Sequence, residues 1–453
     1  LSNRSNAMWW RGNSYFWSER RSDFERVAKK VLELQEDSPA RIAYVANYLW
    51  NGLASHHVAI EALLAAEARG ILQESTLRTL ASWCMSTDGK RPSVTLRIVD
   101  GFLEDDPLRL DDRLLRAKAL MSLGRADEAR SELIATEHLL REGDRWTEGN
   151  VAALAQAAIS DVPALDLAVR YFKEAIAMRD KALGGVARPD WTISFYYAEL
   201  TRAHVGQKQW AEAFAAARSA LVTADARHNH EAKANEAMDL LLRVGPLKDI
   251  IAMHDQEVAR SGQDAALLRK LFGSALLRQR SLDEAIVQLQ KATELQPDDP
   301  ATWDSLVAAH DQNKAADAAL EVLRQSLDVL PFDLERTTAY ATRLEHAKQH
   351  ELAMRAWTQL VELRPDEAVS HERLAASFER HLEWPSALQQ WRRVTDIRPE
   401  EPKSWFGLAD AQARSGANDD ARATLRTMMA KDWEARFGDV KAEVERRLGS
   451  LRG

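Results

Sequence analysis

The sequence has a single cysteine, Cys84, among 453 residues. One thiol excludes an intrachain disulfide, so the fold does not require an oxidising compartment. No apolar stretch approaches the roughly 18 residues that a transmembrane helix needs. Lys plus Arg is 61 and Asp plus Glu is 69, a net charge of −8, so the basic excess of nucleic-acid-binding proteins is missing. We expect a cytoplasmic protein with no membrane span and no nucleic-acid partner.

Motifs of metal, nucleotide and catalytic sites are also missing. The chain has no Gly-rich phosphate loop, no His-Glu-x-x-His and no Cys-x-x-Cys. His346 and His350 straddle the expected turn between two helices, so we interpret them as surface histidines. Cys84 falls inside an expected helix, which favours a half-buried structural thiol over a nucleophile. The sequence therefore predicts no catalytic residue, no metal site and no cofactor.

What the sequence does contain is a period of 34 residues. It separates four prolines, Pro297, Pro331, Pro365 and Pro399. An alanine stands twelve residues before each proline, and the series continues one period further: Ala285, Ala319, Ala353, Ala387 and Ala421. A period of this length is typical of stacked helical hairpins. The proline ends the second helix because it lacks an N–H, and the alanine lets two helices approach closely.

With Trp303 and Trp405 near the start of their repeats, this pattern resembles the tetratricopeptide repeat (TPR) family. One hairpin cannot bury its apolar stripe alone, so neighbouring hairpins stack into a solenoid. We expect an all-α fold, an α-solenoid of about twelve TPR-like helical hairpins with no strand. The resemblance implies a right-handed superhelix in which the first helix of each hairpin lines a concave groove.

The pattern suggests five segments along the chain. Residues 1–7 are expected to be a tag or linker remnant, followed by N-terminal TPR-like repeats over 8–142. Irregular helical hairpins continue the solenoid over 143–262, five regular TPR repeats occupy 263–433, and a capping helix covers 434–453. An aromatic cluster over 8–17 is compatible with a ligand cage, but core packing is favoured because large aromatics dominate buried area. The histidines of His56-His57 and His228-Asn229-His230 are expected in loops.

The candidate binding surface is the groove side of the first helices. In the five regular repeats it would present Lys270, Ser274, Arg278, Asp304, Asp311, Glu335, Thr338, Thr342, Glu345, Glu372, Arg373, Glu379, Arg380, Lys403, Asp410 and Arg414. Tyr44 and Tyr48, one helical turn apart, form a second candidate contact near the N-terminus. Each residue alone is also compatible with the solvated face of an amphipathic helix. As a set of mixed sign, they suit an extended peptide or a protein edge better than a polyanion.

One subtype of the family, the clamp for the terminal carboxylate of chaperones, does not fit. Ser274 and Ser305 stand where the clamp has asparagines, and Glu335 and Ala339 occupy its basic positions. We interpret the chain as a non-enzymatic protein–protein interaction scaffold for a peptide or protein partner. The alternative is the recognition portion of a larger multidomain enzyme whose catalytic domain lies outside this sequence. A self-assembling structural role is a third hypothesis, and the sequence leaves the oligomeric state and the partner open.

Overall fold

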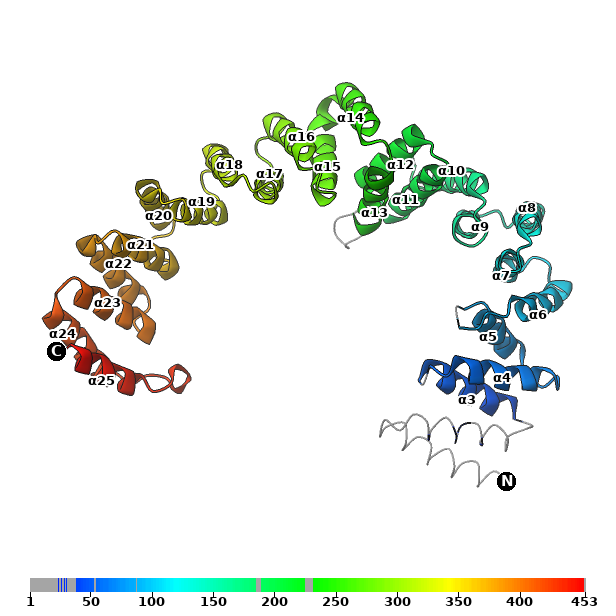
Figure 1. Ribbon diagram of the computed structural model, residues 1–453, viewed down its shortest axis with the longest axis horizontal. Coiled ribbons are helices and arrows are strands. Elements are labelled where there is room, and N and C mark those ends of the chain that lie inside the picture. Colours follow the sequence, from blue (N-terminus) through cyan, green and yellow to red (C-terminus); the bar gives the residue numbers. More distant parts are fainter. Residues whose placement is uncertain are drawn as a thin grey trace. The chain divides into compact units, whose positions relative to one another are not determined.

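The computed structural model describes residues 23, 26, 28, 30 and 38–451, apart from 53, 87, 185–188 and 225–230. All regular structure in this part of the chain is helical (Figure 1). The expected remnant over 1–7, the aromatic cluster over 8–17 and the histidines of 228–230 lie outside the described residues. The chain divides into two compact units, Leu1–Asp255 and Gln256–Gly453. The all-α repeat solenoid is confirmed, and the handedness of the superhelix stays a prediction.

In the first unit, successive helices pack as antiparallel hairpins. The pairs are α3 (Pro39–Asn51) with α4 (His56–Glu67), α5 (Glu74–Cys84) with α6 (Pro92–Asp105), α7 (Leu110–Ser122) with α8 (Ala126–Glu142), α9 (Glu148–Ser160) with α10 (Leu165–Ala182), and α11 (Trp191–Gly206) with α12 (Trp210–Thr223). Next, α13 (Glu231–Val244) packs against both α11 and α12. Helix α14 (Leu247–Ser261) crosses the division between the units.

The second unit contains the regular repeats. Its hairpins are α15 (Ala265–Arg278) with α16 (Leu282–Leu295), α17 (Pro300–Gln312) with α18 (Ala316–Val329), α19 (Leu334–His346) with α20 (His350–Leu363), α21 (Ala368–Arg380) with α22 (Trp384–Ile397), and α23 (Pro402–Arg414) with α24 (Asn418–Ala430). The second helix of each hairpin packs against the first helix of the next. Helix α25 (Val440–Ser450) packs against α24 and ends the described chain.

The prolines of the 34-residue period end the second helices as predicted. Helices α16, α18, α20 and α22 each stop two residues before their proline, and the residue between takes a ψ of 61–80°. At Pro297, Pro365 and Pro399 the proline carbonyl then bonds to a ring nitrogen of the residue six positions later. The donors are Trp303 at 2.7 Å and Trp405 at 2.8 Å, while His371 Nε2 lies 2.9 Å from its proline oxygen. This bond fixes the turn into the next repeat.

The alanines of the period also have the predicted role. Ala285, Ala319, Ala353, Ala387 and Ala421 are all fully buried. The turn inside each hairpin repeats as well, because one residue there always adopts the left-handed backbone conformation. These residues are Arg280, Lys314, Lys348 and Leu382, with φ of 58–61°, and then Gly416 with φ of 86°. The backbone of the regular repeats therefore follows the sequence period closely.

The end of the chain differs from the prediction. The final helix begins at Val440 rather than Glu434, after a short 3₁₀ turn at Ala435–Phe437. Gly438 interrupts the helix with φ 71° and ψ −157°, a conformation that glycine adopts easily. Asp439 then caps α25 by accepting the N–H of Ala442 at 2.9 Å. Phe437 still packs on the last core cluster, so the predicted apolar stripe is present although the helix that carries it is interrupted.

Two predictions in the first unit need correction. His56 and His57 begin α4 instead of lying in a loop, and His56 Nδ1 is 2.8 Å from Asp88 Oδ2. Cys84 is fully buried rather than half-buried, and burial raises the pKa of its thiol to about 11. Such a thiol is protonated at neutral pH, as a structural cysteine should be.

Among the described helices, none is both long enough and apolar enough to cross a membrane.

Candidate partner-binding surface

The sixteen groove residues predicted between Lys270 and Arg414 all lie on the first helices of the second unit, α15, α17, α19, α21 and α23. We call the surface that they form the first-helix face. Thr342 is half-buried, and its hydroxyl donates to the Thr338 carbonyl at 2.8 Å. Glu335 is exposed in the first turn of α19, and Lys270 Nζ is 2.7 Å from Asp299. Tyr44 and Tyr48 lie on α3 in the first unit, with ring centroids 5.6 Å apart.

Ion pairs between consecutive first helices connect most of the charged residues of this face. They are Asp304–Arg336 at 2.9 Å, Asp311–Arg343 at 2.6 Å, Glu345–Arg380, Glu372–Lys403 at 3.1 Å and Glu379–Arg414 at 3.4 Å. Asp410 of α23 continues the series to Arg447 of α25. Apart from Asp304–Arg336, whose arginine is buried, each pair has an exposed or partly exposed base, and exposed pairs contribute only about 0–1 kcal/mol each. They set the positions of side chains more than they stabilise the stack.

Two tryptophans on the second helices hold the carboxylates of this ladder. Trp357 Nε1 donates to Glu345 Oε1 at 2.9 Å, and Trp391 Nε1 donates to Glu379 Oε1 at 2.6 Å. Trp357 and Trp391 are 34 residues apart, so the arrangement repeats. The following first helix adapts to each indole. Arg373 lies over the Trp357 ring, 5.5 Å from its centroid, whereas the backbone of Gly407 lies directly against Trp391.

The sequence pattern does not reveal the most buried charge of this region, Arg336. Arg336 directly follows the exposed Glu335 in α19, yet only 4% of the residue is exposed. Its guanidinium donates to the Pro300 carbonyl at 3.1 Å and to Asp333 at 3.3 Å. Threonine or serine occupies the equivalent positions 302, 370 and 404, so the period predicts a small side chain there.

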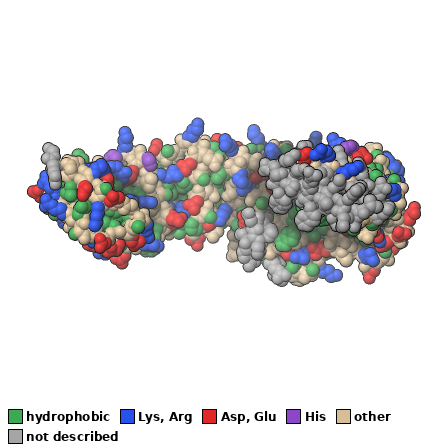
Figure 2. All heavy atoms as spheres, turned by 90° about the horizontal axis from the view of Figure 1, so that it is seen from below, with side chains coloured by type: hydrophobic (Ala, Val, Ile, Leu, Met, Phe, Trp, Pro, Cys, Tyr) green, Lys and Arg blue, Asp and Glu red, His purple; other side chains and the backbone are tan. Residues whose placement is uncertain are grey.

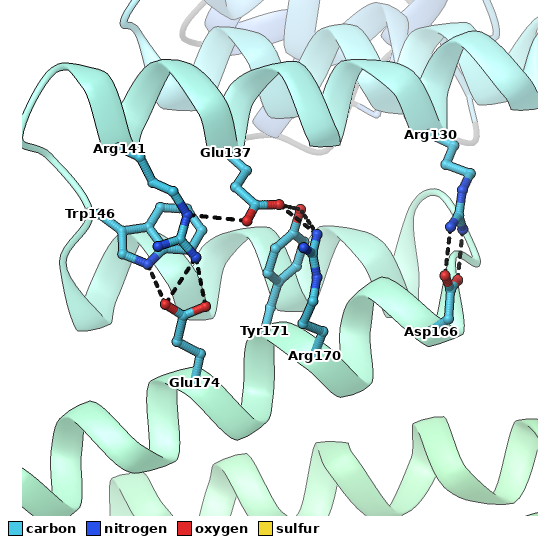
Figure 3. A network of polar contacts seen from close by, with 8 residues as sticks. All are labelled: Arg130, Glu137, Arg141, Trp146, Asp166, Arg170, Tyr171 and Glu174. Atoms are coloured by element: carbon cyan, nitrogen blue, oxygen red, sulfur yellow. Dashed lines mark hydrogen bonds and ion pairs between the residues drawn. The ribbon is translucent and has the colours of Figure 1, made fainter.

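The first unit carries a different polar network, between the second helices α8 and α10 (Figure 3). Glu137 of α8 accepts hydrogen bonds from Tyr171 Oη at 2.8 Å and from Arg170 at 2.5 Å. Burial and the Glu137 carboxylate raise the pKa of Tyr171, so its phenol remains a donor. Arg141 pairs with Glu174 at 2.9 Å and lies 3.9 Å from the Trp146 ring centroid. The network thus links second helices, whereas the ladder of the second unit links first helices.

Two open hollows accompany these helices. One of about 320 Å³ lies beside the α8–α10 network and is lined by Ile134, Glu137, His138, Arg141, Glu142 and Arg170. The other, of about 380 Å³, lies between α20 and α21. Both are open and lined mainly by charged or long side chains.

Across the described part of the chain, no group of three His, Cys, Asp or Glu residues is arranged to hold a metal ion. Lys, Arg, Asp and Glu side chains are interspersed over the surface seen in Figure 2.

Stacked helical hairpins with a ladder of side chains between successive first helices define a class, the helical repeat scaffolds of protein interaction. The tetratricopeptide repeat model matches residues 270–333 and 372–435. The residues in these two ranges are therefore tetratricopeptide repeats, a kind of repeat that in general serves as a protein-interaction scaffold.

Several solved structures resemble parts of the chain. One is YrrB, described as a TPR protein with an unusual peptide-binding site, with 16% identity, a TM-score of 0.30, and coverage of 39% of this chain and 91% of YrrB. Another is MamA from Desulfovibrio magneticus RS-1, with 20% identity, a TM-score of 0.29, and coverage of 38% and 97%. A further MamA structure has 15% identity, a TM-score of 0.32, and coverage of 39% and 96%. A comparison with curated proteins gives no match.

Proposed function

We propose that the chain is a non-enzymatic scaffold that binds a peptide or protein segment along the first-helix face of the second unit. The observation that supports this function is the ladder itself. Charged side chains recur on five successive first helices, and ion pairs connect those of α17, α19, α21 and α23. An extended segment lying across these helices would meet a new set of side chains at each repeat. Tyr44 and Tyr48 offer a second candidate contact in the first unit.

The energetics of the ladder are compatible with binding. Because exposed ion pairs contribute about 0–1 kcal/mol each, a partner can replace one member of a pair without unfolding the repeat. Complementary charges at such a surface mainly raise the association rate and select the partner. Apolar contacts from half-buried residues such as Phe406 would then add to the affinity.

The test is a selection of random displayed peptides against the intact chain, followed by calorimetric titration of the recovered peptides. Arg373→Glu reverses one exposed charge of the first-helix face. Arg355→Glu is the matched control, because Arg355 is exposed on the second helix α20. We expect R373E to weaken binding by roughly tenfold, which corresponds to about 1.4 kcal/mol, and R355E to change it less than about twofold. A selection without enriched peptides, or an equal loss in both variants, would refute the proposal.

A further inference from the structure

The ion pairs of the first-helix face differ in which partner reaches solvent. Between α19 and α23 the base is exposed and the acid is recessed. The side-chain exposures are 54% for Arg380 against 15% for Glu345, 77% for Lys403 against 14% for Glu372, and 64% for Arg414 against 17% for Glu379. This part of the ladder is formally balanced, yet it presents positive charge outward.

The acids are recessed because of specific hydrogen bonds. Trp357 and Trp391 donate their indole N–H to Glu345 and Glu379, which draws both carboxylates toward the second helices. Glu372 lies between two bases, with Lys403 at 3.1 Å and Arg398 at 3.7 Å. The carboxylates are thus held below the exposed ends of the basic side chains.

Arg373 enlarges the positive area. It is exposed on α21 and lies over the Trp357 ring instead of reaching toward the carboxylates below. We call Arg373, Arg380, Lys403 and Arg414 the basic strip. The strip extends over α21 and α23, two consecutive first helices.

The charges reverse on the side of the strip toward α17. In the pair between α17 and α19 the acid is exposed and the base is buried, with Asp304 of α17 at 68% and Arg336 of α19 at 2%. Glu335 is exposed at the start of α19. Asp410 lies on α23 itself, between Lys403 and Arg414 in the sequence, and its 47% exposed carboxylate pairs with Arg447. A long polyanion that continues from the strip toward α17 would therefore meet negative charge, whereas a short acidic segment confined to the strip would not.

We propose that the basic strip binds a short run of aspartate and glutamate residues within an extended peptide. The segment that continues toward α17 would carry basic or neutral residues, because Asp304 and Glu335 are exposed there. The charge order along the face thereby sets the direction of the bound peptide. This inference rests on the proposed function and adds the chemical class of the partner to it.

The test measures fluorescence anisotropy of a short labelled peptide in which glutamate alternates with serine. Peptides with glutamine or lysine in place of glutamate, and a single-stranded oligonucleotide, serve as comparisons. The variant R373Q/R380Q/R414Q removes three charges of the strip. The control R355Q/R393Q/R426Q removes three exposed charges from the second helices α20, α22 and α24. Circular dichroism verifies that both triple variants remain folded.

At low salt we expect the glutamate peptide to bind at least about tenfold more tightly than the glutamine peptide. The strip variant should lose this difference, the control should keep it, and about 0.15 M salt should reduce it. Equal loss in both triple variants, equal binding of the lysine peptide, or tighter binding of the oligonucleotide would overturn the inference. If the unbiased selection recovers peptides that bind the strip variant unchanged, this inference fails while the scaffold function stands. If it recovers none, the scaffold function fails.

Discussion

Replacing Gly407 by alanine should destabilise the repeat that α23 begins. Gly407 lies in the middle of α23, where alanine is usually preferred by about 1 kcal/mol. A Cβ at this position, however, would meet three ring carbons of Trp391 at 2.4, 2.5 and 2.6 Å. Carbon atoms pack at roughly 3.5–4.0 Å, so the indole would have to move by about 1 Å. The clash should therefore exceed the gain in helix propensity.

The magnitude follows from two terms. Overpacking of this kind costs about 1–3 kcal/mol. Moving the indole also weakens the 2.6 Å hydrogen bond from Trp391 to Glu379, a loss of roughly 1 kcal/mol. After subtraction of about 1 kcal/mol for helix propensity, we expect Gly407→Ala to cost about 1–3 kcal/mol. The double variant G407A/W391L should recover part of this, because leucine occupies the equivalent positions Leu323 and Leu425.

Native-state hydrogen exchange of the amides in α22 and α23 measures this effect locally, which matters because repeat arrays do not always unfold in one step. The single variants and the double variant form a cycle, and we expect a coupling of about 1–2 kcal/mol between the two positions. Additive effects, or a more stable G407A, would show that the indole does not pack against this backbone.

Three further changes test the packing, the turns and the pH dependence. Ala319→Leu should lower the free energy of unfolding in urea by about 1–3 kcal/mol, because Ala319 is fully buried. Ala316→Leu, at the exposed start of α18, should change this free energy by no more than about 0.5 kcal/mol. Equal effects of the two substitutions would contradict the helix contacts. Leu382→Gly should stabilise the chain by up to about 1 kcal/mol, because glycine adopts the left-handed φ of 59° more easily than leucine and the leucine side chain is mostly exposed. A lower melting temperature of the variant would refute this. Burial lowers the pKa of the His204 imidazole in the folded chain. Below the ordinary histidine pKa of about 6.5, the unfolded chain therefore binds more protons than the folded chain, and the free energy of unfolding should decrease as the pH falls through that value. His204→Gln should flatten this dependence, and an unchanged pH profile would exclude His204 as its source.

The repeat architecture was predictable because single residues encode it sterically. Ala319 and Pro331 each exclude an alternative, namely a wide helix crossing and a continued helix, so their period alone locates the hairpins. The start of α25 was not predictable from apolar spacing, because Gly438 breaks the helix without changing the stripe. The mismatch at Cys84 has a similar origin, since the sequence does not show how closely the neighbouring helices α4 and α6 cover it.

The surface was predictable only as a set of positions. The period places Glu345 and Glu379 on the first helices, but it does not tell that Trp357 and Trp391 recess them. Nor does it tell which partner of each pair reaches solvent, because that depends on side-chain rotamers and on the neighbouring repeat. Arg336 is the extreme case, a buried charge in a position that holds threonine or serine at 302, 370 and 404. The character of the first-helix face therefore emerges from pairs of residues about one repeat apart.

Hydroxyl-radical footprinting of the intact chain with a selected peptide tests the central proposal most directly. Val369 and Phe406 report on the first-helix face, while Leu352 and Met354 report on the second helix α20. We predict that saturating peptide reduces oxidation of Val369 and Phe406 and leaves Leu352 and Met354 unchanged. Protection of Leu352 and Met354 with full oxidation of Val369 and Phe406 would contradict binding along the first-helix face.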